Sequence, residues 1–123
     1  MRNSKLLPLA ILYANEADAV EGITRMQKLV FLAQKKCDGI DEYEFRADSY
    51  GPFSVDLYDD LDEMVDEGYV ERDRESTPNG NHKDIYSLTE KGEDYVEQVL
   101  FEYGLYKQVP LDGLREIKQE YNP

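Results

Sequence analysis

Two short segments with a period of two, residues 69–74 and 84–88, constrain the fold of this chain more than any other feature. Between them lies Ser76-Thr77-Pro78-Asn79-Gly80-Asn81-His82, in which Asn-Gly favours the tight turn of a β-hairpin. An isolated hairpin is only marginally stable in water. The pattern therefore predicts a hairpin that packs against other elements.

Two helices are predicted before the hairpin from their apolar spacing. Leu6 to Tyr13 is apolar on most sides, which predicts a mostly buried helix. After a loop over residues 15–22, Thr24-Arg25-Met26-Gln27 has the form of a capping box. We expect the helix that follows to run to about Lys36.

A third helix is predicted between Gly51-Pro52 and Gly68, because proline is tolerated in a first turn and glycine favours a helix end. Asp38 to Ser49 is either a short strand or an extended connection. The expected apolar stripe of the third helix is Leu57, Tyr58, Leu61, Met64 and Val65. Its opposite side is expected to expose Asp56, Asp59, Asp60, Glu63, Asp66 and Glu67.

After the hairpin, Thr89 is expected to cap a fourth helix that stops near Gly104, and a short last helix follows Pro110. The resulting order is three helices, a hairpin and two helices. It predicts a mainly α fold with a small β-hairpin, a winged helix-turn-helix with additional C-terminal helices. The length of 123 residues fits a single domain, 1–123, with a core of about 5–103 and a C-terminal helical extension of about 104–123.

The formal net charge of -13 is concentrated in one part of the chain. Residues 1–37 carry six bases and three acids, residues 38–67 one base and twelve acids, and residues 68–123 seven bases and twelve acids. At ordinary salt this balance excludes a strongly basic nucleic-acid binder. The acidic block fits a solvated face, adaptation to a high-salt cytoplasm, or a surface for a basic partner.

Three segments resemble a known family. Gly22-Ile23-Thr24-Arg25-Met26-Gln27-Lys28-Leu29-Val30-Phe31-Leu32, Phe45-Arg46-Ala47-Asp48-Ser49-Tyr50-Gly51-Pro52-Phe53-Ser54 and Asp84-Ile85-Tyr86-Ser87-Leu88-Thr89-Glu90-Lys91-Gly92 resemble the YwgA-like winged-helix family. That family is similar to the SocA-like Panacea antitoxin domains. The resemblance covers roughly residues 5–103 and implies a winged helix-turn-helix domain. It implies a regulator in the first case and a protein that neutralises toxins in the second.

No catalytic constellation is visible in the sequence. It contains no phosphate-binding loop, no nucleophile elbow and no metal-ligating set of Cys and His. His82 is the only histidine, and we expect it to be a loop residue. Cys37 is the only cysteine, and we expect it to lie in the core. We therefore expect a protein that is not an enzyme, has no cofactor or metal, is soluble and cytoplasmic, and has no membrane segment.

The residues expected to contact DNA fall in three places. The start of the second helix offers Arg25 and Lys28 to the flanking phosphates. The start of the third helix offers Ser49, Tyr50, Phe53 and Ser54, together with backbone N–H groups. The wing offers Arg72, Arg74, Asn79, Asn81, His82 and Lys83 to the minor groove or to phosphate. For each residue the alternative is an ordinary exposed polar side chain.

The leading functional hypothesis is a winged-helix regulator that binds double-stranded DNA and is adapted to high salt. A homodimer is expected through the fourth and last helices, from Val96, Leu100, Leu111, Leu114 and Ile117. The alternative is an antitoxin-like interaction module that neutralises a basic protein through the acidic face of residues 56–67. At molar salt the Debye length is about 3 Å, so the acids would repel phosphate much less.

Overall fold

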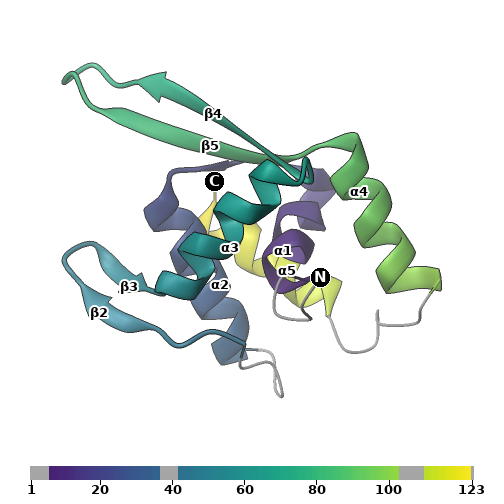
Figure 1. Ribbon diagram of the computed structural model, residues 1–123. Coiled ribbons are helices and arrows are strands. Elements are labelled where there is room, and N and C mark those ends of the chain that lie inside the picture. Colours follow the sequence, from purple (N-terminus) through teal and green to yellow (C-terminus); the bar gives the residue numbers. More distant parts are fainter. Residues whose placement is uncertain (1–5, 37–41, 103–109, 123) are drawn as a thin grey trace.

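The computed structural model describes residues 6–36, 42–102 and 110–122 (Figure 1). In chain order the elements are α1 (Leu6–Ala17), β1 (Val20–Glu21), α2 (Ile23–Lys36), β2 (Arg46–Asp48), β3 (Gly51–Phe53), α3 (Val55–Asp66), β4 (Val70–Ser76), β5 (His82–Leu88), α4 (Glu90–Glu97), the π-helix η2 (Gln98–Glu102) and α5 (Leu111–Tyr121). Within these residues the order confirms three helices, a hairpin and two further helices. Cys37, Tyr103 and Gly104 lie outside the described residues.

The predicted hairpin supplies two strands of a three-stranded antiparallel sheet with the order β1-β5-β4, in which β5 is central. Strands β4 and β5 pair from Val70 opposite Leu88 to Ser76 opposite His82, so both are longer than the sequence pattern predicts. Their far end projects beyond the helices as a wing, while a second hairpin, β2–β3, lies on the other side of α3 (Figure 1). We call β4, β5 and the turn 77–81 the wing.

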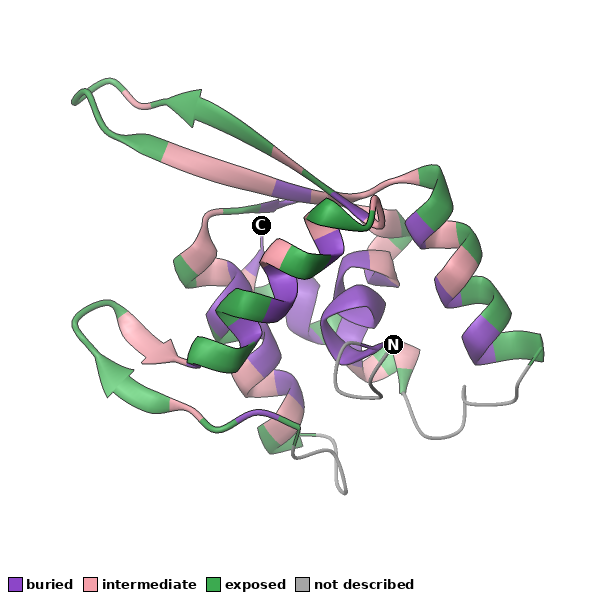
Figure 2. Cartoon of the chain, viewed as in Figure 1, coloured by how far each residue is buried: buried purple, intermediate pink, exposed green. Residues whose placement is uncertain are grey.

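Helix α1 runs through the middle of the core, as its apolar sequence predicts. Nearly every residue from Leu6 to Leu12 is buried, and α5 packs along it (Figure 2). The sheet joins this core through Val20, Val70 and Tyr86, of which Tyr86 is only 1% exposed. Burying the base of the hairpin on the helices supplies the stability that the hairpin alone would lack.

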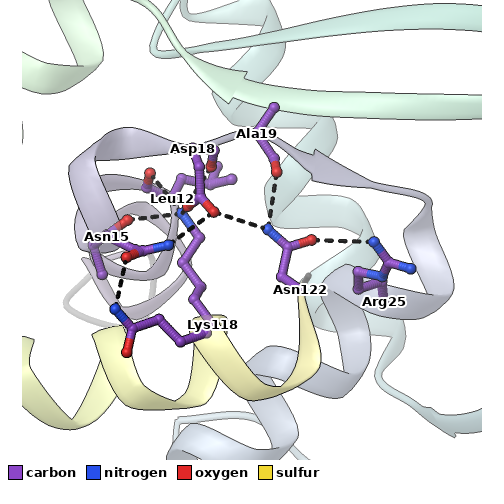
Figure 3. A network of polar contacts seen from close by, with 9 residues as sticks. Leu12, Asn15, Asp18, Ala19, Arg25, Lys118 and Asn122 are labelled. Atoms are coloured by element: carbon purple, nitrogen blue, oxygen red, sulfur yellow. Dashed lines mark hydrogen bonds and ion pairs between the residues drawn. The ribbon is translucent and has the colours of Figure 1, made fainter.

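The end of α1 is fixed by a buried lysine of α5. Asn15, Glu16 and the next residue have positive φ angles between 55° and 58°, which ends the helix abruptly. Lys118, 0% exposed, donates hydrogen bonds to the carbonyl oxygens of Leu12 (3.2 Å), Ala14 (2.9 Å) and Asp18 (2.8 Å), as Figure 3 shows. The Asp18 carboxylate also forms an ion pair with it at 2.5 Å.

The environment of Lys118 has two opposing effects on its pKa. Burial lowers the pKa of the ammonium, and the hydrogen bond and charge of Asp18 act in the opposite direction. Three left-handed residues other than glycine are unfavourable by about 1 kcal/mol each. The Lys118 ammonium offsets this strain, because its hydrogen bonds to the carbonyl oxygens stabilise the turn that brings them together.

Two predicted helix starts are wrong. The capping box over residues 24–27 does not form, because α2 begins at Ile23 and places Thr24 inside the helix. Gly51 and Pro52 belong to strand β3 instead of opening α3, which begins after its N-cap, Ser54. Proline suits this short strand, because its missing N–H is tolerated on an edge strand. Residues 20–21, expected in a loop, form β1 and pair with β5.

The Thr89 cap is confirmed, since its Oγ1 accepts a hydrogen bond from the Gly92 N–H at 3.0 Å. The residues chosen for a dimer interface are instead part of this chain's own core. Val96, Leu100, Leu114 and Ile117 are at most 2% exposed, and Leu111 packs against the same cluster. When only the sequence is considered, these apolar residues are too many for one small core. The core uses all of them because α1 is buried on most sides and is covered by α4, η2 and α5.

Replacing Lys118 with methionine should destabilise the fold by about 3 kcal/mol, because the three carbonyl oxygens lose their donor. Thermal unfolding followed by circular dichroism should show a fall in Tm of roughly 10 °C. Lys35→Met, at an exposed position of α2, is the matched control and should change the Tm little. Equal stability of Lys118→Met and the unmodified protein would contradict the assigned role.

Two glycines in helices should respond oppositely to alanine. A Cβ at Gly92 would overlap the Tyr69 carbonyl oxygen, so Gly92→Ala should destabilise by about 2 kcal/mol despite its better helix propensity. A Cβ at Gly113 has only Pro110 atoms near 3.9 Å, so Gly113→Ala should stabilise by about 0.5 to 1 kcal/mol. Urea denaturation of both variants measures the change in unfolding free energy. A change of the same sign in both variants would refute the prediction.

Candidate nucleic-acid interface

Helix α3 is tied to α2 through backbone atoms. The buried side chain of Gln27 accepts a hydrogen bond from the Ser54 N–H (2.8 Å) and donates one to the Ser54 carbonyl oxygen (3.0 Å). Ser54 also caps α3, since its Oγ accepts a hydrogen bond from the Leu57 N–H at 3.2 Å. Ser54 is only 1% exposed, so its side chain is not available to a nucleic acid.

The outer side of α3 is acidic, although the helix is rotated from the predicted orientation. Tyr58, expected in the core, is 43% exposed, while Asp60, expected outside, is 1% exposed. The Tyr43 hydroxyl donates a hydrogen bond to Asp60 at 2.7 Å, a contact between distant residues that periodicity does not reveal. The exposed carboxylates of this side are Asp56, Asp59, Glu63, Asp66 and Glu67.

The three basic side chains named in the strands of the wing are paired with acids of this chain. Arg72 pairs with Asp62 of α3, and this hydrogen bond raises the pKa of Arg72. Arg74 Nε lies 3.1 Å from the Asp84 carboxylate. In the same way, Lys83 Nζ lies 3.1 Å from the carboxylate of Glu21 in β1. Exposed pairs of this kind add little stability, but they remove most of the positive potential that a phosphate would meet.

The turn at the end of the wing is held by its own hydrogen bonds. The Thr77 N–H donates to the Asn81 carbonyl oxygen at 2.7 Å, and the Gly80 N–H donates to the Thr77 carbonyl oxygen at 3.0 Å. Gly80 has φ +84°, which a residue with a Cβ rarely adopts. The side chain of Asn79 bonds within the turn to Thr77, whereas Asn81 and His82 are exposed next to it.

The start of α2 lies beside strand β5, midway along the wing. Its preceding residue, Gly22, donates a backbone hydrogen bond to the Asp84 carbonyl oxygen of β5 at 2.7 Å. Arg25 is half-buried and donates to Asn122 Oδ1 at 3.3 Å (Figure 3), while Lys28 is exposed. In the part of the chain that the structure describes, neither Arg25 nor Lys28 forms an ion pair with an acid.

The remaining predicted contacts, Ser49 and Tyr50, form the turn between β2 and β3. The β2–β3 hairpin lies across α3 from the wing (Figure 1), so these two residues are separated from the wing tip. Tyr50 is 85% exposed. Phe53 is half-buried, and the Arg46 guanidinium lies 5.8 Å from its ring centroid.

The structure therefore brings some of the predicted residues together and separates others. The start of α2 contacts the wing through Gly22, whereas Tyr50 lines a pocket with Ile23 and Thr24 of the same helix. Sequence reasoning missed the acids that neutralise the wing, because Glu21 and Asp62 come from other elements. Among the described residues no cluster of His, Cys, Asp and Glu could hold a metal ion, and no helix is long and apolar enough to cross a membrane.

The model of the PadR-like transcriptional regulator family matches residues 42–98, which include α3, the wing and α4. The fold is a winged helix. The match supports a winged-helix regulator family and indicates a transcriptional regulator, but it does not support the finer resemblance to YwgA-like or Panacea domains or to a toxin-binding function. A search of curated proteins and a search of solved structures each found no match.

Replacing Gln27 with leucine should loosen α3 from α2, because the buried Ser54 N–H and carbonyl oxygen both lose their partner. The expected loss is about 3 kcal/mol of unfolding free energy, measured by urea denaturation. Gln119→Leu is the matched control, since Gln119 is exposed and, among the described residues, its side chain hydrogen-bonds only to Asn15, at 3.3 Å. A loss no larger than that of the control would show that the Gln27 contacts do not hold the helix.

Proposed function

We propose that this winged-helix protein is a DNA-binding transcriptional regulator that works at high salt. Its proposed DNA surface is the start of α2, with Arg25 and Lys28, together with Asn81 and His82 at the tip of the wing. The observation that carries the proposal is the backbone bond between Gly22 and Asp84, which holds the first turn of α2 beside strand β5 of the wing. The match to PadR-like transcriptional regulators supports the same function.

This surface carries much less unpaired positive charge than the DNA surface of a basic winged helix. The outer side of α3 repels phosphate, and the strand bases of the wing are already paired within the chain. At molar salt the Debye length is about 3 Å, so the repulsion from α3 is largely screened. Affinity must then rest on short-range contacts from asparagine, histidine and backbone groups.

A homodimer is part of this proposal, since two-fold symmetric regulators read two half-sites of one operator. Its interface must use surfaces other than Val96, Leu100, Leu114 and Ile117, which are buried within one chain.

Fluorescence anisotropy with duplex DNA from upstream of the protein's own gene should detect binding in 1 to 2 M KCl, compared with a duplex of scrambled sequence. In the described part of the chain, Arg25 and Lys28 are the lysine and arginine side chains of the proposed surface that pair with no acid. The plot of log affinity against log salt concentration should therefore have a slope of about -2, because each neutralised phosphate contributes roughly -0.9. Absence of binding in molar KCl would refute the proposal, and a slope of about -4.5 per protomer would show that the three paired wing bases also bind phosphate.

The double variant Arg25→Ala, Lys28→Ala should lower the affinity about tenfold at 1 M KCl and bring the salt slope close to zero. Lys35→Ala lies near the other end of α2 and should leave both quantities unchanged. If the two variants have the same effect, the start of α2 does not contact DNA.

A further inference from the structure

An apolar group lies exposed at the start of α3. Tyr50 is 85% exposed, Val55 49% and Tyr58 43%, and among the described residues the only other large exposed hydrophobic side chain is Phe101. The rings of Phe53 and Tyr58 lie 6.0 Å apart, which joins the β2–β3 hairpin to α3. Exposed apolar side chains gathered in one place and surrounded by charge are typical of protein interaction sites.

A small pocket opens beside this group. Its volume is about 160 Å³, and its walls include Ile23, Tyr50, Pro52 and Phe53. A cavity of about 150 Å³ is large enough for a benzene molecule. The pocket can therefore receive one aliphatic or aromatic side chain, and it borders the exposed ring of Tyr50.

Exposed acids outnumber exposed bases in the β2–β3 hairpin and α3. Asp48, which belongs to the pocket wall, and Asp56, Asp59 and Glu63 of α3 are exposed. The nearest base of the hairpin is Arg46, which stacks on the Phe53 ring. A phosphate backbone or an acidic protein would be repelled here, whereas arginine and lysine side chains would be attracted.

We propose that this surface, the α3 face (Asp48, Tyr50, Val55, Asp56, Tyr58 and Asp59), docks a basic segment of a partner protein. One apolar side chain of that segment enters the pocket, and its cations pair with the carboxylates around it. A second copy of this chain fits poorly, because a two-fold interface would set the same carboxylates against one another. The pocket wall includes Ile23 and Thr24 of the first turn of α2 and so adjoins the proposed DNA surface, but the proposal does not rest on DNA binding.

The test is an NMR titration of the ¹⁵N-labelled full chain with a synthetic peptide in 0.1 M KCl. The peptide carries four arginines spaced by alanines and one central leucine. We expect the amide signals of Gly51, Phe53 and Tyr58 to shift with a common saturation curve, while that of Gly113 in α5 stays in place. Absence of saturable shifts, or equal shifts throughout the chain, would overturn the proposal.

Three comparisons separate docking from general attraction to an acidic protein. A peptide with serine in place of leucine should bind at least tenfold more weakly if the pocket is used. Tyr50→Ser with Tyr58→Ser, and separately Asp56→Asn with Asp59→Asn, should each weaken binding about tenfold. The matched control, Glu116→Gln with Glu120→Gln on exposed positions of α5, should change it less than twofold.

Each of the opposite results would overturn the docking site. If the leucine peptide and the serine peptide bind equally, the pocket is not used. A control as damaging as Asp56→Asn with Asp59→Asn would show that only net charge is recognised. Shifts of the same amide signals on adding a DNA duplex without the peptide would assign the α3 face to nucleic acid instead. A wild-type protein that fails to bind DNA but passes these tests would refute the proposed function alone.

Discussion

The contact between Lys118 and three carbonyl oxygens of the first 18 residues holds the two ends of the described chain together. It fixes where α1 ends, and the turn that follows sets the direction of β1. Because β1 pairs with β5 and leads into α2, the base of the wing and the start of α2 both depend on this contact. Asn122, one turn after Lys118, extends the same network to Arg25.

The two sides of α3 differ in charge. For this reason we assign DNA to the wing side and a basic protein partner to the other side. Toward the wing, carboxylates are used internally, and each of Glu21, Asp62 and Asp84 is paired with a base. On its outer side, α3 exposes Asp56 and Asp59 together with Val55 and Tyr58. A net charge of -13 is thus compatible with a nearly neutral wing, because its excess lies on other surfaces.

Local patterns predicted the helices, the wing and the Thr89 cap, because each depends on neighbours in the chain. The errors concern contacts between distant residues. The sequence predicts Gln27 as part of a capping box, but its side-chain amide hydrogen-bonds to Ser54. It predicts Asp60 as a surface acid, but Asp60 is buried and accepts a hydrogen bond from Tyr43. The wing bases could be named from the sequence, but their neutralisation could not, because it requires the register of β1, β4 and β5.

The hydrogen bonds between Gln27 and Ser54 also affect which surface residues of α3 can change in evolution. Gln27 contacts only main-chain atoms of Ser54, and the cap uses a side chain that is itself buried. The orientation of α3 is therefore independent of the residues on its outer side. Those residues can change from acidic to basic, or from tyrosine to polar, while the helix keeps its place. One scaffold can in this way acquire different partners by surface substitution alone.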